Sequence, residues 1–266
     1  MVWDWASCLL CMVVKMPKLF VCSDIHSAYT PWMKALNNAG FDENNPEHKI
    51  IVCGDLFDRM DESIEVLHFV MSMVSKDKII LIKGNHETLL EECCMREFPY
   101  SYDTSNGTRK TIQDIGGAAH GIPFDECCQI TWNKTARYRE LLVNYFETQN
   151  YIFVHSWIPT ISYKGMYHSY NKDWREATQS EWEEAMWGNP FNMWLAGLNK
   201  TGKTIIFGHW HVSTGHSIAS GGELSEFGED ACWKPFIHDN IIAIDRCTAY
   251  TGEVNVLVLE DEFLEG

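Results

Sequence analysis

Positively charged side chains are scarce in this chain of 266 residues. Lys and Arg together number 21 against 37 Asp and Glu, which gives a formal net charge of -16. A surface this acidic repels the phosphates of a nucleic-acid backbone, so we expect no nucleic-acid partner. A small phosphorylated substrate is still compatible with this charge, because bound cations can reverse the sign of the field inside a pocket.

Long apolar runs are also missing. The apolar run at residues 7–14 is too short to span a bilayer. The residues before it contain Asp4 but no Lys or Arg, whereas a secretory signal begins with positive charge. We therefore expect no membrane association, and we interpret residues 1–15 as an N-terminal extension ahead of Met16. The sequence leaves open whether this extension belongs to the natural protein.

The cysteines lack the arrangement expected of a disulfide framework. Of the 10 Cys residues, Cys22 and Cys53 end apolar runs, where a free Cys behaves as a small hydrophobic side chain. The adjacent pairs at 93–94 and 127–128 have an awkward geometry for bridging within the pair. This usage favours a reducing, cytoplasmic compartment.

Three other motifs lack the context that their chemistry requires. Residues 8–11 have CxxC spacing, but no second such pair follows to complete a zinc site. Residues 197–204 match the P-loop pattern, yet a helix is expected before them and a strand after them, which reverses the required order. The Trp-rich stretch at 174–194 favours core or lid packing over a base-stacking platform.

Apolar side chains make up 45% of the sequence and aromatic side chains 13%, which suffices for one large folded domain. No linker divides the chain, so we expect a single domain over residues 16–266. Apolar runs of strand length alternate with helical spacing. The expected strands are 18–22, 49–53, 78–82, 151–154 and 204–207. The expected helices are 31–38, 61–74, 87–97 and 180–187. Residues from about 100 to 150 are expected to form a mostly helical insertion, which is either a lid or specificity surface or inert padding. Residues 241–244 and 254–259 are expected to form a terminal hairpin.

Polar side chains follow the end of each expected strand. The blocks are Asp24-Ile25-His26, then GDLFDR at 54–59, GNHE at 84–87, His155, and Gly208-His209-Trp210-His211. Ligands bind at the carboxyl ends of strands in helix-covered sheets, and carboxylate, amide and imidazole groups suit divalent metals. We therefore expect a metal site at this edge. Glycines 54, 84 and 208 are expected to let the backbone turn sharply out of the sheet.

The order and spelling of these blocks, above all GDLFDR and GNHE, resemble the calcineurin-like metallophosphoesterases. This superfamily includes the Ser/Thr protein phosphatases and the bis(nucleosyl)tetraphosphatases, and the resemblance runs from about Leu19 to Leu259. It implies an α/β fold, a four-layer αββα sandwich of two mixed β-sheets flanked by helices. It also implies a phosphoric ester hydrolase with two divalent metal ions, Mn²⁺ first and Fe, Zn, Mg, Ni or Co as alternatives.

The resemblance also implies a role for each polar residue of these blocks. Asp24 and His26 match ligands of the first metal, and Asp55 matches the bridge between both metals. The ligands implied for the second metal are Asn85, His155 and His209. His211 matches the second histidine of the superfamily's GHxH block, which reaches the first metal, although protein phosphatases generally do without it. His86 and Asp58 match the general acid and its orienting partner, and Arg59 matches a phosphate clamp.

Elementary chemistry agrees with these roles. Two cations about 3.5–4 Å apart can share a carboxylate, activate a bridging hydroxide and hold phosphoryl oxygens. The departing alkoxide needs a proton, which an imidazolium held by a carboxylate can supply. A guanidinium offers a planar fork that fits two phosphate oxygens.

Simpler interpretations exist for single residues of the blocks. His155 alone would be an ordinary satisfied polar side chain, Asp24 and Asp55 could be caps, and Asp58 with Arg59 could be a surface ion pair. Five blocks together favour the metal site.

The substrate is less defined than the reaction. Ser23, Ser27 and Met60 stand where protein phosphatases usually carry glycine, and residues 155–157 replace a His-Gly-Gly. We expect a phosphomonoesterase similar to the Ser/Thr protein phosphatases, whose phosphorylated substrate is a phosphoprotein or a nucleotide. The alternative is a dinucleoside polyphosphate hydrolase or nucleotide phosphodiesterase. A metal-bound scaffold without catalysis is a third hypothesis.

Overall fold

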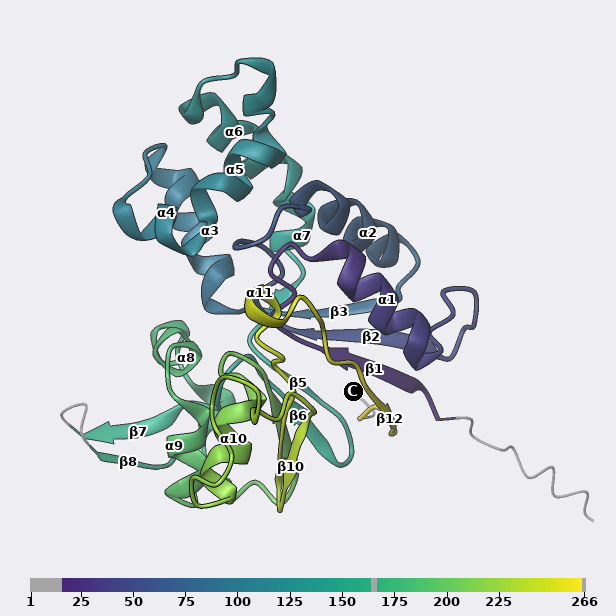
Figure 1. The fold of residues 1–266 in the computed structure, drawn as a ribbon, viewed down its shortest axis with the longest axis vertical. Coiled ribbons are helices and arrows are strands. Elements are labelled where there is room, and N and C mark those ends of the chain that lie inside the picture. Colours follow the sequence, from purple (N-terminus) through teal and green to yellow (C-terminus); the bar gives the residue numbers. More distant parts are fainter. Residues whose placement is uncertain (1–15, 164–166, 265–266) are drawn as a thin grey trace, which may run out of the picture.

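Two five-stranded sheets form the centre of the computed structural model, which describes residues 16–163 and 167–264 (Figure 1). The first sheet has the order β12 (Leu257–Glu260), β1 (Lys18–Cys22), β2 (His48–Cys53), β3 (Ile79–Ile82) and β4 (Leu142–Val143). The second has the order β10 (Phe236–His238), β11 (Ile241–Ala243), β9 (Thr204–Phe207), β6 (Tyr151–Phe153) and β5 (Phe146–Glu147). In each sheet the central strands are parallel and an edge strand is antiparallel, so both sheets are mixed. A separate hairpin pairs β7 (Thr160–Tyr163) with β8 (Tyr167–Tyr170).

The two sheets pack face to face through alternate side chains of their strands. Leu19 and Val21 of β1 lie in one apolar cluster with Phe153 of β6 and Ile206 of β9. The residues between them, such as Phe20, point to the opposite face and pack against helices. Successive side chains of a strand alternate between its faces, so one apolar run supplies both layers of core.

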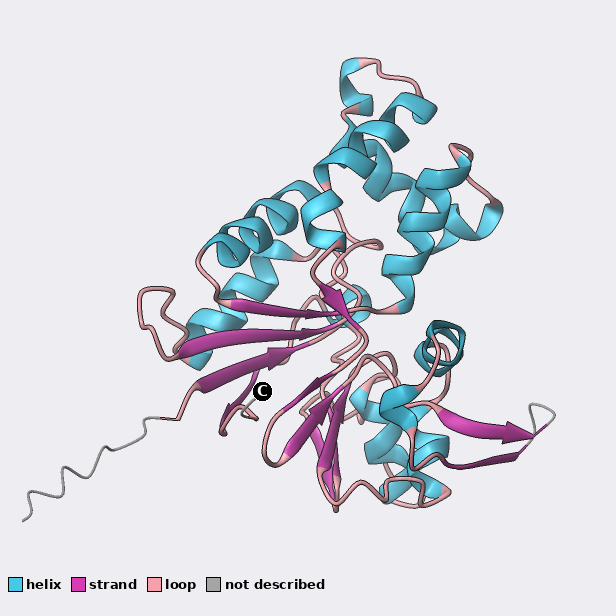
Figure 2. Ribbon diagram, turned by 180° about the vertical axis from the view of Figure 1, so that it is seen from behind, coloured by secondary structure: helices cyan, strands magenta, loops and turns pink. Residues whose placement is uncertain are grey.

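Helices cover the outer face of each sheet (Figure 2). Those on the first sheet are α1 (Tyr29–Ala39), α2 (Ser63–Ser75) and α3 (Asn85–Arg96). Those on the second are α8 (Gln179–Met186), α9 (Pro190–Leu195) and α10 (Val212–Ala219). The helix–sheet–sheet–helix order confirms the predicted four-layer α/β sandwich.

A group of helices projects from the first sheet between β3 and β4 (Figure 1). It contains α4 (Ser101–Asn106), α5 (Thr108–Gly116), α6 (Phe124–Lys134) and α7 (Ala136–Arg139), with a short 3-10 turn at Ala118–His120. Its base packs on α3, where the Cys128 thiol contacts the carbonyl of Cys93 at 3.9 Å. All eight cysteines of the described ranges are free thiols, and Cys8 and Cys11 lie outside those ranges.

The predicted terminal hairpin is wrong. β11 and β12 lie in different sheets, because β11 pairs with β9 and β10 whereas β12 pairs with β1. The short helix α11 (Thr248–Thr251) and the residues after it carry the chain from one sheet to the other. The real hairpin joins β10 to β11 through Asp239, whose φ of 42° is left-handed.

The P-loop-like segment and the Trp-rich stretch both lie in the structural context that the sequence indicated. The P-loop-like segment lies between α9 and β9, so no helix follows it. The Trp-rich stretch includes a 3-10 turn at Trp174–Glu176. Its Trp174 and Trp182 are buried in the apolar cluster between the second sheet and its covering helices. Among the residues described, no helix combines the length and the apolar character needed to cross a bilayer.

Candidate dinuclear metal site

The polar blocks meet where the parallel strands of both sheets end. Asp24 and His26 follow β1, Asp55 follows β2, and His155 and His209 follow β6 and β9. Asn85 and His86 form the first turn of α3, which begins two residues earlier than the sequence pattern indicated. A cavity of about 150 Å³ opens between these loops, and its lining includes Asp24, His26, Asp55, Arg59, Asn85, His86 and His209.

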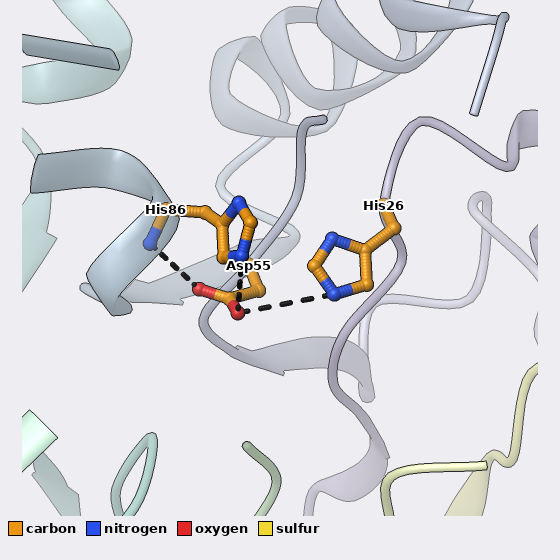
Figure 3. Close-up of side chains that lie close together, drawn as sticks. All are labelled: His26, Asp55 and His86. Carbon is orange, nitrogen blue, oxygen red and sulfur yellow. Dashed lines mark hydrogen bonds and ion pairs between the residues drawn. The ribbon is translucent and has the colours of Figure 1, made fainter. Parts of the chain in front are cut away.

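Asp55 lies at the centre of this cluster. Its Oδ2 is 3.9 Å from His26 Nε2 and 3.9 Å from His86 Nε2, and Figure 3 shows the carboxylate between the two rings. Its Oδ1 is 3.4 Å from His155 Nε2. Two groups of potential ligand atoms, each within 4.8 Å, therefore share Asp55: one with His26 and His86, the other with His155 and His209. A carboxylate with one oxygen toward each group is suited to bridge two cations.

The second group has an atomic arrangement that fits a cation. His155 Nδ1 donates to the carbonyl of Cys53 at 2.9 Å, so a neutral ring has its lone pair at Nε2. That nitrogen lies 2.8 Å from Asn85 Oδ1 and 3.1 Å from His209 Nδ1. Three ligand atoms converge on one point, and a hydrogen bond from a ring N–H to the backbone is the usual way a metal ligand is oriented.

The first group is oriented in the same manner. His26 Nδ1 donates to the carbonyl of Phe57 at 3.0 Å, which leaves Nε2 directed at the cluster. Asp24 Oδ1 lies 3.9 Å from that nitrogen, and the other carboxylate oxygen accepts from His209 N at 2.9 Å. Burial lowers the pKa of His26 to about 3, although the charge of Asp55 opposes this. The ring is therefore neutral near pH 7, as a metal ligand must be.

His86 has a different environment from the other histidines. Its Nδ1 donates to Asp58 Oδ2 at 2.7 Å, and its Nε2 lies 3.3 Å from Arg59 Nη2. Burial lowers the pKa of His86, but the charge of Asp55 and the hydrogen bond to Asp58 outweigh burial and raise it to about 9 in the metal-free protein. Cations at Asp55 would weaken the first of these two effects. The arrangement suits a proton donor.

His211 lies at the cavity wall, and its ring belongs to neither of the two ligand groups. Its Nε2 is 3.2 Å from Glu226 Oε1, and its Nδ1 lies within 3.1 Å of the hydroxyls of Ser213 and Thr214. Both ring nitrogens therefore have protein partners. In this conformation His211 borders the cluster instead of joining it.

Strained backbone concentrates in these loops. Most of the non-glycine residues with positive φ in the described ranges belong to the blocks or directly follow one: Asp24, His26, Ser27, Asp55, Asp58, Arg59 and His209. The left-handed region costs such residues about 1–2 kcal/mol each, and strain of this kind gathers at functional sites. The strain at these seven residues therefore indicates that the loops form a functional site.

The block glycines serve two purposes, of which the sequence revealed only one. Gly54 has a φ of 82° and makes the expected sharp turn. Gly84 and Gly208 instead permit close approach, since an added Cβ would lie 2.3 Å from Asp55 Oδ1 and 2.1 Å from Asp24 Oδ2. A side chain at either position would push a carboxylate out of the site.

Sequence reasoning missed Glu87, which joins two of the loops. Its buried carboxylate accepts from the backbone N–H of Gly84, Asp55 and Leu56 at 2.8, 2.9 and 3.0 Å and from Tyr138 Oη at 2.9 Å. Glu87 is the last residue of the GNHE block, so the sequence did contain an indication of its importance. Glu87 fixes the backbone of Asp55 relative to the start of α3.

Asp245 was also missed. It is 6% exposed, lines the cavity and accepts from Cys247 N at 2.7 Å. Burial, followed by the charge of Asp24, raises the pKa of Asp245 well above its usual range. The strand-end rule would have found it after β11, but the hairpin assignment obscured that strand end.

Replacing Glu87 with glutamine should destabilise the protein. The amide NH₂ would face N–H donors that the carboxylate now satisfies, and each buried unsatisfied group costs about 1–3 kcal/mol. We expect a loss of roughly 2–5 kcal/mol of unfolding free energy in urea. The matched control is Tyr138→Phe, which removes one donor and should cost about 1 kcal/mol. Equal losses in the two variants would contradict the joining role of Glu87.

A family model described as calcineurin-like phosphoesterase matches residues 17–234, which is more than half of the chain. The chain belongs to this family. The match spans every predicted metal-ligand position, from the loop after β1 to the loop after β9. It confirms the resemblance drawn from GDLFDR and GNHE, and it agrees with the observed sandwich of two mixed sheets.

Individual relatives of this phosphoesterase-family chain match over shorter lengths. A Proteus mirabilis protein named symmetrical bis(5'-nucleosyl)-tetraphosphatase is 37% identical over 68 residues, which is 26% of this chain and 23% of the relative. A Caenorhabditis elegans protein named as a candidate serine/threonine-protein phosphatase, C06A1.3, is 37% identical over 70 residues, 26% of this chain and 18% of that protein. The chain thus spans less than a quarter of the length of these curated relatives.

Solved structures share the fold over most of this chain. The crystal structure of a cold-active protein-tyrosine phosphatase from a psychrophilic Shewanella species aligns with a TM-score of 0.53 at 14% identity. The alignment covers 92% of this chain and 76% of that one. At this identity the likeness concerns the fold alone.

Proposed function

We propose that this protein is a dinuclear metal-dependent phosphomonoesterase similar to the Ser/Thr protein phosphatases. The observation that carries the proposal is Asp55, whose two carboxylate oxygens each face a separate group of ligand atoms. The ligands would be Asp24 and His26 for one metal, Asn85, His155 and His209 for the other, and Asp55 for both. His211 would contribute only after turning from Glu226. The ligands are imidazole, carboxylate and amide groups without a thiolate, which suit a borderline-hard divalent metal. Within that class we propose Mn²⁺, the ion that the family resemblance implies, with Fe, Zn, Mg, Ni or Co as alternatives.

When bound, the two cations would supply a hydroxide for in-line attack and would neutralise phosphoryl oxygens. The remaining steps belong to the side chains. Arg59 holds two oxygens of the phosphoryl group, and His86 delivers the proton from Nε2 to the departing oxygen. Asp58 holds the ring through Nδ1, so that Nε2 faces the cavity.

The dimensions of the cavity favour a small phosphoryl group. Its volume of about 150 Å³ is on the scale of a single phosphoryl group beside Arg59. A larger cavity of about 680 Å³ lies where Trp157 meets α8 and α9, two residues from His155. This second cavity, together with the relative named as a tetraphosphatase, supports dinucleoside polyphosphate hydrolysis as the alternative.

The physiological substrate we propose is a phosphoprotein, with a nucleotide under the alternative function. The free thiols of the described residues, four of them where the helical insertion packs on α3, support a reducing cytoplasmic compartment.

Three substrates test the proposed activity on the metal-reconstituted protein: p-nitrophenyl phosphate, bis(p-nitrophenyl) phosphate and diadenosine tetraphosphate. The proposal predicts the highest kcat/KM for the monoester. Preference for the diester or the tetraphosphate would establish the alternative. Absence of turnover with all three, despite bound metal, would favour the scaffold hypothesis.

Replacing Arg59 with alanine should raise KM for the monoester. A hydrogen bond to a charged group is worth about 1.5–3 kcal/mol, which corresponds to a loss of roughly 10- to 100-fold in kcat/KM. Arg59→Lys keeps the charge but not the fork, so its loss should be smaller. Steady-state kinetics gives KM and kcat/KM for both variants. An alanine variant with the wild-type KM would show that Arg59 does not hold the phosphoryl group.

A further inference from the structure

The helical insertion contacts the acid dyad, defined here as His86 and Asp58. Thr108 Oγ1 donates to Asp58 Oδ2 at 2.5 Å, and Thr111 Oγ1 donates to Asp58 Oδ1 at 2.8 Å. Both threonines belong to the first turn of α5, where residues three apart share a face. The insertion therefore reaches the site with two hydroxyls, one for each carboxylate oxygen.

Asp58 depends on these hydroxyls for its orientation. Its side chain is fully buried, and the third donor to it is His86 Nδ1, on the same oxygen as Thr108. Thr111 Oγ1 also accepts from Asp58 N at 3.1 Å, so the backbone and the side chain of Asp58 are both held by α5. A buried carboxylate that loses a donor must turn or admit water, because an unsatisfied charge is costly there.

The backbone around the dyad has a second contact with the insertion. Gly107, the residue before α5, lies so close that an added Cβ would be 2.3 Å from Arg59 N. Asp58 and Arg59 have φ values of 76° and 64°, which are costly for residues with side chains. Close packing from α5 holds this segment in its left-handed conformation.

We propose that Thr108 and Thr111 are positioning residues for proton donation by His86. They hold Asp58, Asp58 holds the imidazole, and the imidazole thereby presents Nε2 to the leaving oxygen. The insertion between β3 and β4 is on this account part of the catalytic apparatus, and not inert padding. The inference rests on the proposed function, since it needs His86 to act as the acid.

The test compares the double variant Thr108→Val/Thr111→Val with Thr108→Ser/Thr111→Ser, which restores the hydroxyls. The matched control is Thr131→Val, because Thr131 is also fully buried in the insertion but donates to the carbonyl of Ile112 and not to Asp58. Each protein is assayed with phenyl phosphate, a poor leaving group, and with dinitrophenyl phosphate, whose leaving group needs no proton. Metal content and urea unfolding are measured on the same samples.

The valine double variant should lose roughly 10- to 100-fold in kcat for phenyl phosphate, the usual effect of removing a partner that orients an active-site group. Turnover of dinitrophenyl phosphate, KM and metal content should change little, and the serine variant should recover activity. Equal losses with both substrates, or a matching loss in Thr131→Val, would overturn the positioning role. A wild-type protein without metal-dependent turnover would instead overturn the proposed function, so the two failures are distinguishable.

Discussion

Asp55→Asn should bind fewer than two metal ions and lose turnover on the order of 1000-fold. The amide keeps one oxygen but no charge, and its NH₂ would repel a cation on one side of the bridge. Metal-ion stabilisation of a phosphoryl transition state is worth several kcal/mol, and each 1.4 kcal/mol corresponds to a factor of ten in rate. Metal analysis and p-nitrophenyl phosphate kinetics on the same preparation measure both effects.

A matched control separates loss of metal from loss of fold. Asp261 is also a buried aspartate, but it accepts from the backbone and side-chain nitrogens of Asn150 at 2.9 and 2.6 Å, outside the cavity lining. Asp261→Asn should lower stability while leaving metal content and turnover near wild type. Full metal content and activity in Asp55→Asn would refute the bridge.

His86→Asn should retain both metals and lose its acid catalysis. General acid catalysis contributes about 10²- to 10⁴-fold, so kcat for phenyl phosphate should fall within that range. Dinitrophenyl phosphate needs no proton at its leaving oxygen, and its turnover should fall far less. Leaving-group dependence therefore distinguishes a missing acid from a damaged site.

The same variant tests the other interpretation of His86. The ring belongs to one of the two groups of potential ligand atoms, so loss of one metal equivalent would show that His86 is a ligand and not the acid. His216→Asn serves as the control, because His216 lies on α10 and contacts the carbonyl of Lys234 at 3.1 Å, outside the cavity lining.

The convergence of the candidate site residues could be predicted because these residues directly follow the ends of strands. A buried parallel strand is visible as an apolar run, and the residue after it must leave the sheet at a known edge. Asp24, Asp55 and His209 follow this rule, so their proximity in space can be predicted without knowing the conformation of the loops. The rule also indicates Asp245, but only when β11 is recognised as a parallel strand.

Other features depend on contacts between distant segments that no local pattern encodes. The pairing of β12 with β1 joins strands that are far apart in the sequence, so short-range hairpin signals misplaced β12. Thr108 and Thr111 have the spacing of an ordinary helix, and their importance appears only when α5 is seen against Asp58. His211 satisfied the GHxH pattern, yet the rotamer that pairs it with Glu226 is decided by the loop after α10.

Metal titration of the stripped protein tests the dinuclear mechanism most directly. Mn²⁺ is added to the chelator-treated protein in steps, and bound metal and p-nitrophenyl phosphate turnover are measured on each sample. The account predicts negligible activity until the second equivalent binds, followed by a rise to a plateau at two ions per chain. Full turnover in the presence of chelator, or none with two ions bound, would contradict it.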